Sequence, residues 1–188
     1  MDASTPMQEK TRSDSSSLGM KIEIAEETPS DMAAIRTVTI SAFLHAQHTS
    51  HSEQLIVDAL REAGQLTVSL VAKVDGTVVG HVAISPVSIS DGATGWYGLG
   101  PISVAPEYQR RGIGSRLMRE ALHVLQGQGA SGCVVLGEPK YYNRFRFAVV
   151  PNLMLPGVPR EYFQALSFGA SNPRGTVSYH AAFNAFDT

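Results

Sequence analysis

The sequence predicts a mixed α/β fold in which a β-sheet is flanked by helices. Stretches with the two-residue periodicity of strands alternate along the chain with stretches of helical periodicity. Asp75-Gly76 separates two β-rich runs and is a strong signal for an antiparallel hairpin. The run from Cys133 to Leu136 is wholly apolar, as expected of a buried strand in parallel pairing. Antiparallel and parallel signals in one chain indicate a mixed sheet.

The expected elements can be placed in order along the chain. Residues 1–19 are polar and rich in serine, so we expect a flexible N-terminal extension, followed by a single domain over residues 20–188. Strands are expected at 21–27, 66–74, 77–89, 96–104, 133–136, 147–155 and 176–183. Helices are expected from Ser30 or Asp31 to Phe43, from Ser52 to Gly64, after Gly112 as far as Gly127, and as a short turn at 141–145. The proline-bearing segment 156–173 is expected to be irregular.

Composition narrows the classes of partner. The net charge is -2, which gives no general attraction to nucleic acid or to an anionic membrane. The apolar runs are far shorter than the roughly 18 residues that a membrane span needs. The single cysteine, Cys133, cannot form an internal disulfide, and no Cys/His cluster has the spacing of metal ligands. We therefore expect a cytoplasmic protein without a metal, a membrane partner or a nucleic-acid partner.

An anion-binding cradle is expected where the strand ending at Val104 meets the helix that begins after Gly112. The first N–H groups of a helix lack intrahelical partners and carry the positive end of the helix dipole, which favours phosphate. Glycine at 112 and 114 leaves the backbone open to such a ligand. Positive charges near a helix start oppose the helix dipole. Arg110 and Arg111 therefore favour an anion-binding site over a plain strand-turn-helix junction. The glycine spacing matches neither a P-loop nor a dinucleotide-binding GxGxxG motif.

The strand that leads to the cradle is expected to be irregular. It contains Gly98-Leu99-Gly100-Pro101, in which proline cannot donate to a ladder and glycine weakens it. A β-bulge is the simplest structure that accommodates these residues.

Two segments resemble a known family. Gln109-x-x-Gly112-x-Gly114, preceded by Val-x-Pro and followed by an amphipathic helix, resembles the acetyl-coenzyme A signature of the GNAT superfamily of N-acetyltransferases. The segment from Leu136 to Phe147 is similar to the LG(D/H)PxYYxRFGF segment of the YhbS-like predicted acetyltransferases. The likeness covers about residues 20 to 155 and leaves the last thirty or so outside. Arg146 departs from it, because that family usually has glycine there, and a turn requiring positive φ would be strained by arginine.

The resemblance implies a GNAT-type sheet in which a bulge splays two central strands apart. The pantetheine arm of acetyl-CoA, the co-substrate, would lie in that opening and bond to backbone groups around Ile102 and Val104. The residues expected to bind acetyl-CoA are Ile102, Ser103, Val104, Gln109, Arg110, Arg111, Gly112, Ile113, Gly114, Ser115 and Tyr142.

The implied chemistry is acyl transfer from a thioester to an amine, which needs a proton for the departing thiolate. By position in the family pattern, Tyr142 is expected to supply it, with the adjacent Tyr141 as the rival and an aromatic wall as the alternative role for both. Glu138 is expected to be the general base, or else a solvated charge at a strand end. His45, His48 and His51 cluster in one loop, where a contribution to substrate binding competes with simple solvation.

We therefore expect an N-acetyltransferase that moves acetyl from acetyl-CoA to a small-molecule or peptidic primary amine by direct attack in a ternary complex. The alternative is a coenzyme A-binding sensor or scaffold without turnover, which would need the cradle but not Tyr142. The proline-bearing stretch 151–173 could cover a sheet edge or form a homodimer contact. The sequence does not identify the acceptor amine, because acceptor pockets are built from loops.

Overall fold

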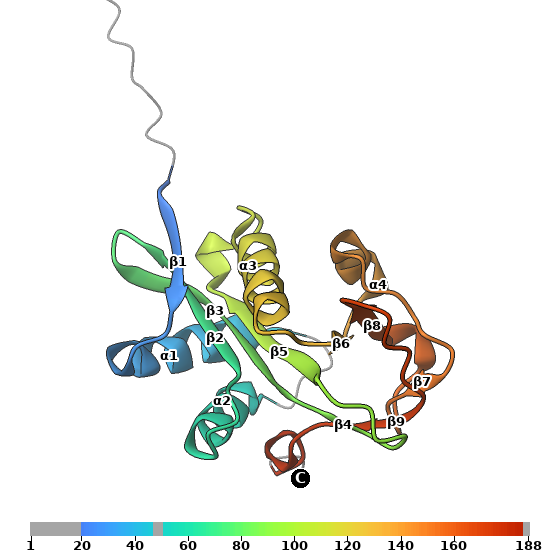
Figure 1. Ribbon diagram of the computed structural model, residues 1–188. Coiled ribbons are helices and arrows are strands. Elements are labelled where there is room, and N and C mark those ends of the chain that lie inside the picture. Colours follow the sequence, from blue (N-terminus) through green and yellow to red (C-terminus); the bar gives the residue numbers. More distant parts are fainter. Residues whose placement is uncertain (1–19, 47–50, 186–188) are drawn as a thin grey trace, which may run out of the picture.

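The computed structural model describes residues 20–46 and 51–185 (Figure 1). The strands are β1 (Ile22–Glu26), β2 (Val68–Val74), β3 (Thr77–Pro86), β4 (Ser88–Ile89), β5 (Trp96–Val104), β6 (Gly132–Leu136), β7 (Leu153–Met154), β8 (Phe163–Ser167) and β9 (Gly175–Ser178). The α-helices are α1 (Met32–Phe43), α2 (Glu53–Glu62), α3 (Ile113–Gly127) and α4 (Pro139–Tyr142). Short 3-10 turns are η1 (Pro29–Asp31), η2 (Pro106–Tyr108), η3 (Asn143–Phe145), η4 (Arg160–Tyr162) and η5 (Ala181–Phe183). The predicted extension 1–19 and His48 lie outside the described residues.

The main sheet is mixed, which confirms the fold class expected from the sequence. It has six strands in the order β1-β2-β3-β5-β6-β8, and a smaller sheet has the order β4-β9-β7. In the main sheet β5 and β6 are parallel, and the other neighbouring strands are antiparallel. The β2–β3 hairpin turns at Asp75 and Gly76, both with positive φ, as the sequence predicted.

Helices cover both faces of the main sheet, with α3 on one face and α1 and α2 on the other (Figure 1). Successive residues of β2 alternate between the two layers. Leu70 and Ala72 pack in the same apolar cluster as Leu117 of α3, whereas Val71 packs with Ile35 of α1. This is the pattern of a strand buried on both faces, and it makes the sheet the middle of three layers.

The predicted bulge lies in β5 and opens the sheet. Ile84 of β3 pairs with Leu99, but Val82, two residues earlier, pairs with Ile102, so β5 carries one extra residue. The parallel pairing of β5 with β6 runs from Trp96 to Leu99 and stops there. Beyond Leu99 the two strands are splayed apart, and among the described residues no strand pairs with the edge of β5 that faces away from β3.

Three expectations for the C-terminal third were wrong. The segment 147–155 is not a strand: it holds one isolated bridge at Ala148 and the two residues of β7, because Pro151 lies in a turn between them. The segment 156–173, which was expected to be irregular, contains β8, an edge strand paired with β6. The buried polar Gln164 hides the two-residue alternation of polar and apolar side chains in β8. The last strand ends at Ser178, and the chain continues into η5.

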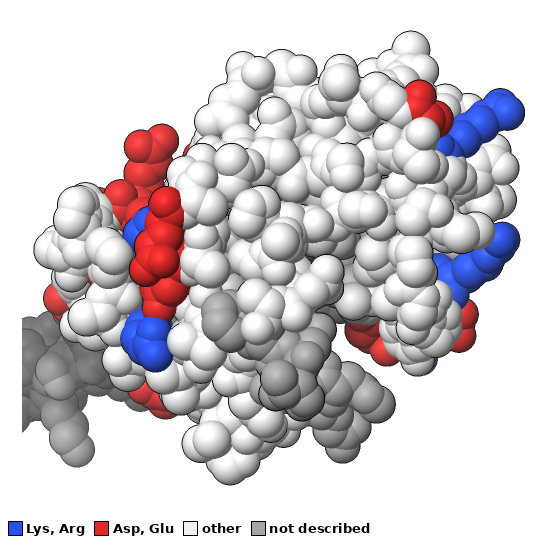
Figure 2. Space-filling view, turned by 90° about the horizontal axis from the view of Figure 1, so that it is seen from below, with Lys and Arg blue, Asp and Glu red and all other residues white. Residues whose placement is uncertain are grey.

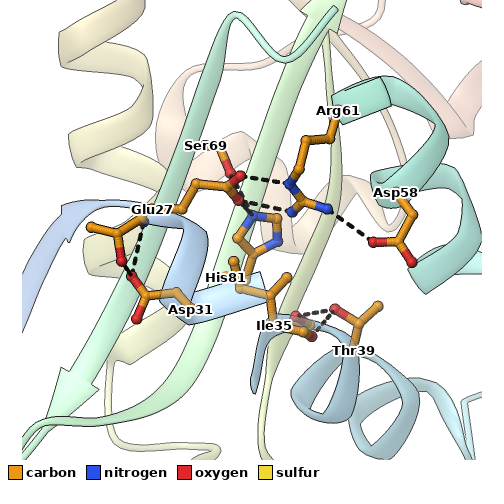
Figure 3. Close-up of polar contacts among 10 residues, drawn as sticks. Glu27, Asp31, Ile35, Thr39, Asp58, Arg61, Ser69 and His81 are labelled. Carbon is orange, nitrogen blue, oxygen red and sulfur yellow. Dashed lines mark hydrogen bonds and ion pairs between the residues drawn. The ribbon is translucent and has the colours of Figure 1, made fainter. Parts of the chain in front are cut away.

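A partly buried polar cluster ties α2 to the main sheet (Figure 3). The Arg61 guanidinium bonds both carboxylate oxygens of Glu27, at 2.7 and 3.0 Å. Ser69 donates to the same carboxylate and lies 2.8 Å from Nε2 of His81, which is 0% exposed. Burial alone would raise the pKa of Glu27, but the hydrogen bonds from Arg61, His81 and Ser69 hold that pKa well below its ordinary value. Burial lowers the pKa of His81 and favours the neutral ring, which has a structural role in this cluster.

Candidate active site

The predicted cradle is present at the start of α3. Gly112 is the N-cap residue and has a φ of +80°, a left-handed conformation in which glycine is unstrained. The first hydrogen bond of the helix runs from the Arg116 N–H to the Gly112 carbonyl, so the N–H groups before it have no intrahelical acceptor. A β-carbon added to Gly112 would meet no atom within 4 Å, which means that this backbone borders open space.

That space is a cavity of about 540 Å³, which we name the cradle cavity. All of the residues predicted to bind the co-substrate line it except Arg111 and Tyr142. The Arg111 guanidinium instead lies 5.6 Å from the centre of the Tyr108 ring. The Val104 carbonyl accepts a hydrogen bond from the Gln109 side chain at 3.0 Å, so this predicted backbone partner is engaged within the chain.

The cradle cavity is cationic. Arg110 and Arg144 line it, and no Asp or Glu is among the described residues that do. Arg144 stacks over the Tyr141 ring, 4.4 Å from its centre, and donates to the Tyr141 carbonyl, which holds the guanidinium at the rim. With the positive end of the α3 dipole, these groups fit a diphosphate.

A second cavity, of about 690 Å³, lies on the other side of the splay, and we name it the apolar cavity. It shares Ile102 with the cradle cavity, so the two spaces meet at the unpaired edge of β5. Its wall comes from α1, α2, β5, the end of β6, the segment 155–158 and the C-terminal segment 177–184.

The two adjacent tyrosines of α4 line different cavities, because neighbouring residues of a helical turn face different directions. Tyr142 lines the apolar cavity with Ile102, whereas Tyr141 lines the cradle cavity. Their rings are nearly perpendicular, at 82°, with centres 5.0 Å apart. Burial, with a smaller effect of Tyr141, raises the pKa of Tyr142 to about 12, so its hydroxyl keeps its proton at neutral pH.

The predicted acid, Tyr142, and the predicted base, Glu138, do not line the same cavity. Glu138 is exposed, its carboxylate accepts from the Lys140 N–H at the start of α4, and it is not among the described residues that line either cavity. Glu53, the first residue of α2, does line the apolar cavity. His45 and His51 are exposed and do not line it.

Sequence reasoning missed the C-terminal wall of the apolar cavity. Tyr179 and Phe183 line it, with ring centres 4.9 Å apart, although both follow the segment that carried the family resemblance. A β-carbon on Gly98 would lie 2.3 Å from Cε1 of Tyr179, so glycine is required at this position of β5 for the tyrosine ring to sit there. The alternation of Val177 and Tyr179 was the one available signal, and it indicated only a strand.

A cationic cradle at a helix start and a second cavity with a protonated phenol in its wall lie on either side of the splayed strands and share Ile102. This arrangement is the one expected of acyltransferases that take an acyl group from a coenzyme A thioester.

Comparisons with known proteins give the family. The model of the Acetyltransferase (GNAT) family matches residues 32–144. The Escherichia coli K12 protein named uncharacterized N-acetyltransferase YhbS is 36% identical over 154 residues, which cover 78% of this chain and 92% of that protein. This chain belongs to the GNAT acetyltransferase family. The expected enzyme class and the expected co-substrate, acetyl-CoA, are thereby confirmed.

Solved structures agree with this. A GNAT family acetyltransferase from Brucella melitensis, crystallised in complex with acetyl-CoA, is 49% identical, with a TM-score of 0.78 over 88% of this chain and 99% of that one. Escherichia coli YhbS in complex with CoA is 32% identical, with a TM-score of 0.80 over 89% of this chain and 94% of that one.

Within the described residues, every helix is too short or too polar to span a bilayer. A cytoplasmic location, a homodimer, the lack of a nucleic-acid partner and the single domain over 20–188 stay predictions.

Proposed function

We propose that this chain transfers the acetyl group of acetyl-CoA to a primary amine by direct attack within a ternary complex. The observation that supports this best is the meeting of the two cavities at Ile102, with Tyr142 in the wall of the second. Two bound reactants in adjoining spaces can react without a covalent enzyme intermediate, and holding them in place lowers the entropic part of the barrier.

In this proposal the cradle holds the co-substrate by its phosphates. The N–H groups of residues 112–115 and the guanidinium groups of Arg110 and Arg144 would bind the diphosphate. The unpaired edge of β5 from Ile102 to Val104 would carry the pantetheine arm towards the apolar cavity. Bound acetyl-CoA supplies an activated thioester whose sulfur can leave as a thiolate.

Tyr142 is proposed to stabilise the departing sulfur. Because its pKa is raised to about 12, its hydroxyl is protonated but is a weaker acid than a thiol, whose pKa is about 8.5. It would therefore act mainly as a hydrogen-bond donor to the sulfur, and the proton that finally reaches the thiol comes from the amine, which loses one on acylation. Glu138 stays the predicted base for that proton, reached through solvent.

The test measures binding and turnover separately. Calorimetry gives the affinity for acetyl-CoA, and a thiol reagent measures CoA release on addition of an amine. We expect Tyr142→Phe to lower kcat about 100-fold, as loss of one preorganised donor does, while the acetyl-CoA Kd stays within about threefold. Tyr162→Phe is the matched control, since Tyr162 is exposed and lies outside the described lining of both cavities.

Each other outcome corrects a different part of the proposal. A wild type that binds acetyl-CoA but releases no thiol with any amine would leave the sensor or scaffold. Equal turnover of Tyr142→Phe and Tyr162→Phe would remove Tyr142 from the mechanism. Absence of acetyl-CoA binding would refute the cradle assignment.

A further inference from the structure

We infer that the apolar cavity accepts a primary amine carried on an apolar body with no second charge, and that the Glu53 carboxylate binds its amine end. This rests on the proposed function and narrows its acceptor to one chemical class.

The first argument is the chemistry of the cavity wall. Apolar side chains from five parts of the chain face this space: Phe43, Ile56, Leu136, Leu155, Val177 and Phe183. At about 690 Å³ the cavity falls within the range of small-molecule sites, whose walls are mostly apolar with a few placed polar groups. A hydrocarbon or aromatic body is stabilised here because the wall removes its apolar surface from water.

The second argument is the charge of the wall. Glu53 carries the only formal charge among the described residues that line the cavity. A carboxylate pairs with an ammonium group, but a diamine would bring a second cation into an apolar wall with no partner, and an amino acid would bring an anion. Figure 2 shows the molecule from the side on which α2 and the C-terminal segment lie, and the white area in the upper middle of this face carries no Lys, Arg, Asp or Glu.

Position supports the assignment to Glu53. It is the first residue of α2, and this helix is held on the sheet by the ion pair between Arg61 and Glu27. The carboxylate is therefore carried by a fixed helix and not by a free loop, as a group that orients a substrate should be.

The test compares three amines of equal chain length. Hexylamine, 1,6-diaminohexane and 6-aminohexanoate differ only in the group at the far end, which is apolar, cationic or anionic. We expect kcat/KM for hexylamine to exceed that of each of the others at least tenfold. A lysine-containing peptide is added as the peptidic alternative, and it is expected to react no faster than the diamine.

The role of Glu53 is tested by binding as well as by turnover. Hexylamine is titrated into the complex of the enzyme with CoA, and Glu53→Gln is expected to weaken its affinity at least tenfold while leaving the acetyl-CoA Kd unchanged. Glu62→Gln is the matched control, because Glu62 is exposed at the end of the same helix and does not line the cavity.

The outcomes separate the two proposals. Turnover that favours the diamine, the amino acid or the peptide overturns this inference and leaves the acetyltransferase intact. Equal hexylamine affinity in Glu53→Gln and Glu62→Gln overturns the role of Glu53. Hexylamine that binds through Glu53 but is never acetylated, with no other amine acetylated either, supports the site chemistry and overturns the proposed function.

Discussion

The cradle cavity and the apolar cavity lie side by side at Ile102 but are assembled in different ways. Most of the cradle comes from one continuous segment, residues 102–115, with Tyr141 and Arg144 added from a second. The apolar cavity draws its wall from residues 43 to 184, in segments far apart along the chain. A site built by one segment can be recognised from a motif, whereas one built by many segments exists only after folding.

The two cavities also differ in their electrostatics and in what supports them. The cradle is lined by two guanidinium groups at the positive end of α3, and the apolar cavity by one carboxylate. The cradle depends on the local geometry of a helix start. The apolar cavity depends on α2, which the half-buried Glu27–Arg61 pair holds on the sheet. Substitutions should therefore affect one cavity without the other.

The largest effect is expected at the cradle. Gly112→Glu places a side chain and a negative charge where the phosphates would bind, and acetyl-CoA affinity should fall more than about 1,000-fold, or about 4 kcal/mol. Calorimetry measures this. Gly92→Glu is the matched control, because Gly92 also has a positive φ, of +83°, meets no neighbour within 4 Å and lines neither cavity. Equal affinity in the two variants would contradict the cradle assignment.

The next effect is expected at the support of the apolar cavity. Glu27→Gln removes the charge that Arg61 and Ser69 bond, and should lower the free energy of unfolding by about 2–3 kcal/mol. Urea denaturation measures the loss. At 25 °C the KM for the amine should rise while the acetyl-CoA Kd does not change. Glu26→Gln, at the exposed neighbouring residue, is the control and should leave the free energy of unfolding almost unchanged. A rise in the acetyl-CoA Kd of Glu27→Gln would show that the two cavities share this support.

Acid should act on the same cluster. The pKa values of Glu27 and His81 are both lowered in the folded protein, so the unfolded chain binds protons at these sites first. Stability is therefore fully present at neutral pH, begins to fall below about pH 6.5 through His81, and falls further below about pH 4.5 through Glu27. Arg61 stays charged throughout this range, because its hydrogen bond to Glu27 raises the pKa of the guanidinium further. Urea midpoints from about pH 5 to about pH 3 should decline more steeply in the wild type than in Glu27→Gln, because only the wild type has a carboxylate to protonate at residue 27. Parallel curves in this range would refute the role of Glu27.

The smallest effect is expected at Arg146. Substitutions there should change the free energy of unfolding but not ligand binding in either cavity. The residue has a φ of +70°, so the turn keeps the glycine-like conformation although the family's usual glycine is absent. Arg146→Gly should relieve a left-handed strain of about 1 kcal/mol, partly offset by the greater freedom of glycine in the unfolded chain. Arg146→Ala keeps the strain and removes the side chain, so the difference in unfolding free energy between the two variants isolates the backbone effect. No difference, or a loss in the glycine variant, would contradict it.

The sequence predicted the parts whose signals are local. The hairpin at Asp75-Gly76, the bulge around Gly100, the start of α3 at Gly112 and the apolar strand β6 are each encoded by a few adjacent residues. Between Tyr141 and Tyr142 the sequence favoured the second, and the structure places it in the apolar cavity. The catalytic and binding roles of these residues stay predictions.

Other parts carried no local signal. The strand β8 was missed because its flanking prolines and the buried Gln164 hide its pattern. Nothing around Glu53 distinguishes it from other first-turn carboxylates, and nothing around Tyr179 indicates that it covers Gly98, about eighty residues earlier in the chain.

By itself, the sequence determined the mixed α/β class, the family and the cofactor end of the site, since strand and helix periods, turn glycines and helix starts depend on neighbouring residues. Only the tertiary structure decided the acceptor end. The bulge in β5 separates two strands, α2 brings Glu53 to the opening, and the C-terminal segment brings Tyr179 and Phe183 against it. Contacts between residues so distant in sequence arise from packing around a common core, and no spacing along the chain records them.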